Sequence, residues 1–300
     1  MKCKWFAVTV VVLLISSWSV LLAQDTKTKV QAYFDQRSAF IKAKDLEGLM
    51  SLQTNDYQDI IIRDREGARN TAKAIFDAVD GVLAASAPLE IRNAGKYLRV
   101  LAEEKVSVKV RGEDWKQLPD KWTVSYLVQE GNSLKCARNI EVDKERVKYI
   151  SGNAYKDEES GLSFVVPEGW EILTGGHPLP GSVSALAPDK TSAALFIFLK
   201  TPGISAQQAV EGDEAMAKSM SKAGGYELYK SGPITVGAFE AYETESRFSI
   251  PGAQERYRRR VYFKARGSLY VLCFDAIPST QWDTLKGNFQ KILDSIQITN

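Results

Sequence analysis

Two apolar stretches that lie far apart in the chain constrain its fold most strongly. Residues 161–173, GLSFVVPEGWEIL, alternate apolar and polar positions on both sides of a Pro-Glu-Gly turn, which predicts two half-buried strands. Residues 268–298 begin with an apolar run typical of a buried strand and end in a helical stripe of apolar residues. The two stretches bracket one domain of about 140 residues, which is an ordinary domain size.

The segment between these stretches predicts more of the same sheet and one helix. Short apolar runs predict strands over residues 183–187 and 193–199, and Ser205 is expected to cap a helix. Residues 257–266 and 269–276 predict a hairpin.

The second half of the chain resembles the PsbP-like domain. The matched positions are Gly161, Phe164, Pro167, Gly169, Trp170, Tyr270, Trp282, Phe289, Leu293 and Ser295. The resemblance implies an antiparallel sheet covered by helices on both faces. It also implies a docking or assembly role without shared catalytic residues, although fold alone does not assign function.

The first half of the chain begins with helical periodicity and then changes to a period of two. Three helices are predicted, over residues 28–44, 46–52 and 72–85. From Leu89 onward the pattern predicts strands, including a hairpin across residues 130–132 and a last strand at 147–150.

This order of elements, together with AFIKAKDLEGLMSLQTNDYQDI at residues 39–60, resembles the nuclear transport factor 2-like (SnoaL-like) domain. The resemblance implies a cone-shaped sheet around a central pocket, in a family of enzymes, ligand binders and dimerisation modules. Asp56, Tyr57 and Asp59 are the candidate ligand-binding residues at the mouth of that pocket; the alternative is that they are turn and strand-edge residues. A homodimer is implied by this resemblance only.

The chain is therefore expected to be an α+β protein of two domains. Helices plus a cone-like antiparallel sheet fill residues 24–152, and a second antiparallel sheet sandwiched by helices fills residues 153–300. The polar, turn-rich stretch 151–160 marks the boundary.

The N-terminal residues predict where in the cell the protein is located. Lys2 and Lys4 precede 19 uncharged, mostly apolar residues that end at Ala23, so residues 1–23 are expected to be a cleaved export signal. An uncleaved membrane anchor is the alternative, because such a run nearly spans a bilayer. The protein is expected to be periplasmic or extracellular.

Charge and motifs exclude several function classes. The chain has 39 basic and 37 acidic residues, which is too balanced for nucleic-acid binding by bulk charge. His177 is the only histidine, so a multi-histidine metal site is not expected. The sequence has no Walker loop and no G-x-G-x-x-G motif, and no cofactor is expected. Cys136 and Cys273 are expected to be buried core residues, with a disulfide between the domains as the alternative.

Residues 256–260, RYRRR, form the one dense basic cluster. On a strand, Arg256, Arg258 and Arg260 share one face and are the candidate partner-binding residues. Pairing across strands with acidic residues of the segment 240–245 is the alternative.

These observations favour a non-catalytic, exported binding or assembly protein with a protein partner in the cell envelope. A membrane contact is expected only if the N-terminal segment stays uncleaved. The alternative function is that of a small-molecule binder or degenerate enzyme that uses the pocket of the first domain.

Overall fold

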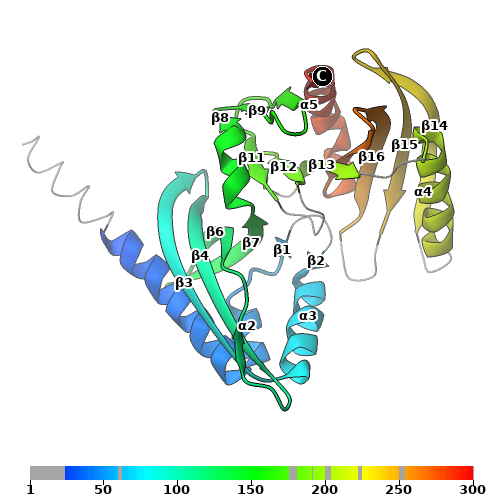
Figure 1. Ribbon diagram of the computed structural model, residues 1–300. Helices are drawn as coiled ribbons and strands as arrows, with labels where there is room; N and C mark the ends of the chain where they lie inside the picture. The colour runs from blue at the N-terminus through cyan, green and yellow to red at the C-terminus, as the bar shows by residue number, and fades with distance from the viewer. Residues whose placement is uncertain are drawn as a thin grey trace, which may run out of the picture. The chain divides into compact units, whose positions relative to one another are not determined.

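The computed structural model describes residues 24–59, 63–175, 181–190, 192–199, 204–221, 225–249 and 254–299 (Figure 1). The predicted export signal and His177 lie outside these residues. The chain divides into two compact units, one made of residues 1–57 and 67–139 and the other of residues 58–66 and 140–300. Each unit combines helices with antiparallel strands, so the predicted α+β class is confirmed.

The first unit opens with helices. Residues 24–43 form one helix, α2 spans Leu46–Ser51 and α3 spans Arg65–Ala78. Asp45 caps α2, because its side chain accepts a hydrogen bond from the Gly48 amide at 2.9 Å.

The predicted bounds of the third helix, residues 72–85, are wrong at both ends. The helix α3 begins at Arg65, seven residues earlier than predicted, and strand β3 begins directly after it at Val79. The β-branched residues Val79 and Val82 favour the strand, and Gly81 disfavours a helix. Trp115 covers Gly81 so closely that a Cβ there would lie 2.8 Å from the Trp115 Cη2 atom.

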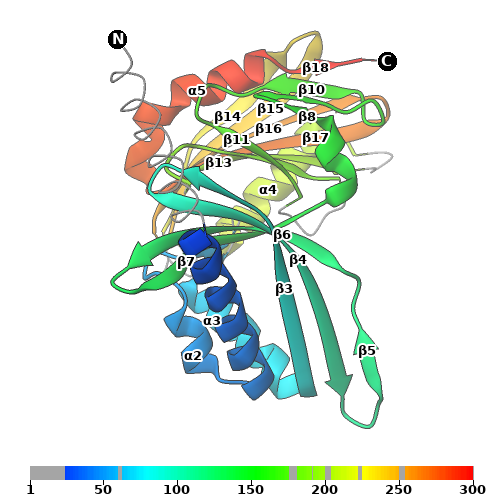
Figure 2. The ribbon, with the colours of Figure 1, turned by 90° about the vertical axis from the view of Figure 1, so that its left-hand side faces the viewer.

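The first unit's sheet has the order β3-β4-β6-β7, and β5 pairs with β4 beyond the end of β6. Figure 2 shows β3 and β4 as one long hairpin with β5 beside β4. The strand bounds are Val79–Ala94 for β3, Tyr97–Val110 for β4, Trp115–Gln117 for β5, Lys121–Glu130 for β6 and Ser133–Val142 for β7.

Strand β3 lies at one end of this sheet and contains Pro88. The pairing of β3 with β4 shifts between Pro88 and Glu90, which marks a β-bulge. A proline fits an end strand because its missing N–H then breaks no ladder hydrogen bond.

The core of the first unit lies between the N-terminal helix and the sheet. Apolar residues of the helix pack against β4, β6 and β7: Val30, Tyr33, Phe34, Val100, Ala102, Leu127, Leu134 and Cys136. These residues recur at three- and four-residue steps on the helix and at two-residue steps on the strands, as the sequence predicts.

The second unit contains two sheets within residues 150–298, besides the two-stranded pairing of β1, Gln58–Asp59, with β2, Arg63–Asp64. The larger sheet has the order β11-β12-β13-β17-β16-β15-β14, and the smaller has the order β18-β10-β9-β8. The larger sheet's strands are β11 Glu171–Thr174, β12 Val183–Leu186, β13 Ala193–Leu199, β14 Tyr226–Val236, β15 Phe239–Phe248, β16 Arg256–Ala265 and β17 Ser268–Ala276. The smaller sheet's strands are β8 Ile150–Ser151, β9 Ala154–Lys156, β10 Leu162–Val165 and β18 Gln297–Ile298.

Helices cover both faces of the larger sheet, as predicted. The helix α5, Trp282–Asp294, packs on the face that carries Leu272 and Phe274, and α4, Ala206–Ser221, packs on the face that carries Leu269 and Val271. Figure 1 shows the two helices on opposite sides of β15 and β16.

Two motif positions of the second half have clear structural roles. Gly169 has a φ of 80°, and the Trp170 amide donates to the Pro167 carbonyl at 3.2 Å, which confirms the predicted Pro-Glu-Gly turn. The Ser295 hydroxyl accepts from the Val165 amide at 3.0 Å and thereby ties the end of α5 to β10.

Residues 140–151 differ from expectation. The predicted strand at 147–150 is instead a 3₁₀-helix, η1, over Lys144–Tyr149, followed by β8, which pairs with β9. These residues group with the second unit. The division between the units falls between Asn139 and Ile140, which is earlier in the chain than the expected boundary at residue 153.

Candidate functional site

The arginines of β16 point to both faces of the larger sheet, as a strand requires. Arg258 forms two hydrogen bonds with the Asp275 carboxylate, at 2.5 and 2.7 Å, and the Asp275 side chain is 2% exposed. Arg260 pairs with Asp213 of α4. Burial raises the pKa of Asp275, but the attraction of Arg258 outweighs burial and holds the pKa below its usual range.

On the opposite face, Arg259 forms the pairing across strands with the segment 240–245 that was expected as the alternative for Arg256, Arg258 and Arg260. Its guanidinium pairs with Glu243 at 2.8 Å and donates to Gln290 of α5 at 2.8 Å, while Lys230 pairs with the same Glu243 carboxylate. Tyr257 donates to Glu245 at 2.8 Å.

The side chains of the three predicted partner-binding arginines therefore point into the second unit. Arg256 is buried, and Arg258 and Arg260 are held by Asp275 and Asp213. Their role in binding a partner remains a prediction, and any partner would have to displace internal ion pairs to reach Arg258 or Arg260.

The predicted ligand-binding residues of the first half differ in exposure. Asp56 is exposed, whereas Tyr57 is buried in the apolar core between the N-terminal helix and the sheet. The backbone of Asp59 is in the short strand β1, Gln58–Asp59, and its side chain lies outside the described residues. Their ligand-binding role also remains a prediction.

Sequence reasoning missed a polar group inside the first unit. Arg37 of the N-terminal helix donates to the Glu104 carboxylate of β4 at 2.8 Å and to the Ser86 hydroxyl of β3 at 3.3 Å. Thr123 of β6 donates to the same Glu104 oxygen at 3.4 Å. The available signal was Arg37 lying four residues after Tyr33, on the apolar stripe of the helix.

The two cysteines among the described residues, Cys136 and Cys273, are both buried, and neither forms a disulfide. Burial raises the pKa of the Cys136 thiol to about 12, and burial likewise raises the pKa of Cys273. Both thiols are therefore protonated near neutral pH and lack the thiolate that a nucleophile or metal ligand needs.

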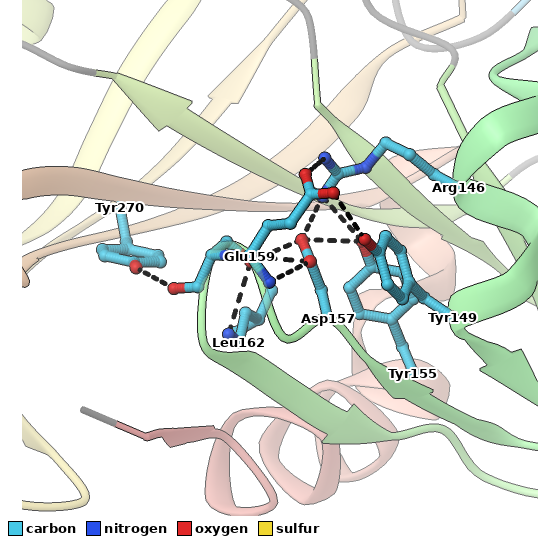
Figure 3. A network of polar contacts seen from close by, with 8 residues as sticks. Arg146, Tyr149, Tyr155, Asp157, Glu159, Leu162 and Tyr270 are labelled. Atoms are coloured by element: carbon cyan, nitrogen blue, oxygen red, sulfur yellow. Dashed lines mark hydrogen bonds and ion pairs between the residues drawn. The ribbon is translucent and has the colours of Figure 1, made fainter.

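A second missed group surrounds Asp157, which directly follows β9 and opens the turn that leads to β10 (Figure 3). One carboxylate oxygen accepts from the amides of Glu159 at 2.9 Å and Ser160 at 3.3 Å. The other accepts from the Ser160 hydroxyl at 2.6 Å, the Tyr155 hydroxyl at 3.3 Å and the guanidinium of Arg146.

This arrangement makes Asp157 a structural clamp. Its side chain is fully buried, and five donors fill the acceptor positions that a general base would need free. Burial raises its pKa, but the bonds from Ser160 and the charge of Arg146 outweigh burial and hold the pKa below its usual range. Arg146 lies on η1, so the clamp fastens η1 to the start of β10.

The first unit also carries an exposed apolar surface, here called the β3–β5 patch, formed by Leu83, Ala85, Ala87 and Trp115. Leu83 is 41% exposed and Trp115 is 47% exposed. Gly81, Leu83, Ala85 and Ala87 alternate along β3 and so share one face, and Trp115 lies over Gly81 on that face. Lys109 is the register partner of both Gly81 and Trp115 and is exposed beside the patch.

Two further observations limit the chemistry of the described residues. They contain no group of three or more His, Cys, Asp or Glu residues placed to hold a metal ion. Within the same residues, no helix combines the length and apolar character needed to cross a membrane.

No family model matches the chain, and no curated protein matches it. Among solved structures, cyanobacterial PsbP (CyanoP) from Synechocystis sp. PCC 6803 is similar at 20% identity, over 49% of this chain and 91% of that chain, with a TM-score of 0.39. An NTF2-like protein with a cystatin-like fold from Novosphingobium aromaticivorans is similar at 13% identity, over 43% and 88%, with a TM-score of 0.36. The protein Aln2 from a Streptomyces species is similar at 12% identity, over 41% and 94%, with a TM-score of 0.36. Scores this low carry no argument about function.

Proposed function

We propose that this chain is a non-catalytic, exported protein that acts in the periplasm or outside the cell by binding another protein of the cell envelope. The observation that carries the proposal is the β3–β5 patch. Leu83 and Trp115 are large apolar side chains that are exposed to solvent on one face of the sheet. Contiguous exposed apolar patches mark protein contact sites.

The state of the buried charged groups supports a binding role over a catalytic one. The carboxylates of Asp157 and Asp275 accept hydrogen bonds from arginine side chains, and the Cys136 thiol is protonated. A catalytic acid or base needs a free position and a pKa close to the working pH. These groups instead stabilise the fold.

The patch also indicates the chemistry of the partner. Trp115 and Leu83 would contact an apolar surface, and the exposed Lys109 beside them would face acidic groups at its rim. The contact surface proposed here replaces the arginine strand, because the guanidiniums of Arg258 and Arg260 already serve internal ion pairs.

The test is crosslinking in cells with the tagged full-length protein and two matched double variants. Leu83→Glu with Ala85→Glu places charge on the patch, where both side chains are exposed and Lys105 is the register partner of Ala85. Val165→Glu with Tyr229→Glu places the same charge on exposed apolar positions of the second unit, each 44% exposed.

We expect the first double variant to lose a reproducible envelope partner and the second to keep it, with both folded by circular dichroism. Retention of the partner by the first variant, or its loss from both variants, would refute the patch as the contact surface. The mass of the recovered protein also tests whether residues 1–23 are removed, as we propose.

A second candidate function is small-molecule binding or a degenerate enzyme activity in the first unit. The buried polar group of Arg37, Glu104, Ser86 and Thr123 favours it, since such groups inside a helix-and-sheet fold also occur in ligand sites. Native mass spectrometry of the purified protein tests it: a retained small molecule that is absent from an Arg37→Ala variant would support this candidate.

Family membership is part of the same proposal. We infer a nuclear transport factor 2-like unit followed by a PsbP-like unit, on the sequence motifs and on the order of elements within each unit. The first resemblance also leads us to propose a homodimer, which light scattering of the purified protein tests directly.

A further inference from the structure

We draw no further inference here: the strongest remaining candidate, a shallow groove of about 380 Å³ between β14 and β15 that is lined by Pro233, Thr235, Glu240 and Tyr242, carries nothing because no feature of the described residues shows what would occupy it.

Discussion

Replacing Asp157 tests the clamp at the start of the second unit's smaller sheet. In Asp157→Asn the volume is kept and one oxygen still accepts from the Glu159 and Ser160 amides. The new amide group, however, faces three donors: the Ser160 hydroxyl, the Tyr155 hydroxyl and the Arg146 guanidinium. Arg146, whose side chain is only 15% exposed, loses its buried counter-charge.

The expected cost in free energy of unfolding is about 3 kcal/mol, the lower end of what removing one partner of a buried ion pair costs. That loss is a large part of the stability of an ordinary domain. The assay is urea unfolding followed by tryptophan fluorescence, because Trp170 and Trp282 both belong to the second unit's core region.

The matched control is Glu159→Gln. The Glu159 side chain is 70% exposed and accepts from the Tyr149 hydroxyl, while the backbone amide that Asp157 needs stays in place. We expect its free energy of unfolding to fall by less than about 1 kcal/mol, as is usual for exposed contacts. If Asp157→Asn were no more harmful than this control, the clamp would be shown to contribute nothing to stability.

The contribution of Asp157 to stability should also depend on pH. The folded pKa of Asp157 lies below its unfolded value, so its contribution is present above the unfolded pKa and is lost as pH falls through the folded pKa. The stability difference between wild type and Asp157→Asn should therefore shrink as pH falls below about 4.

Three further predictions concern other parts of the chain. Gly169→Ala should lower the free energy of unfolding by about 1 kcal/mol, because φ is 80° there, whereas Gly287→Ala, with open space around a helical Cβ, should raise it; equal effects in denaturant unfolding would contradict this. Arg258→Ala should cost about 3 to 5 kcal/mol, and a double-mutant cycle with Asp275→Ala should show strong coupling. Cys136 should react with a thiol reagent only after denaturation, and rapid labelling of native protein would overturn its assigned burial.

Local sequence patterns predicted the parts of the fold that depend on neighbouring residues. The Pro167–Gly169 turn and the helix after Trp282 follow from turn chemistry and from the spacing of apolar residues, and both are present. The predicted range of the third helix was wrong because residues 72–85 contain several alanines, which fit a helix. Pairing with β4 instead places Val79 and the residues after it in a strand.

The candidate site was less predictable, because its contacts join residues far apart in the sequence. Arg37 and Glu104 come from a helix and a strand separated by 67 positions, and their pairing depends on how the sheet folds back. The ion pair of Arg258 was unpredictable for the same reason. The sequence predicted its strand and the sheet face that it shares with Arg256 and Arg260, but its pairing with Asp275 depends on the register of β16 with β17.

Pro88 bears on how the protein behaves when it is concentrated. An end strand with apolar outward side chains, such as Leu83 and Ala85 on β3, can recruit strands of other molecules and grow into aggregates. The proline withholds one N–H from any such added strand, and the bulge that follows it interrupts the regular repeat that stacking needs. Colloidal solubility is thus protected at the very strand that presents the proposed contact surface.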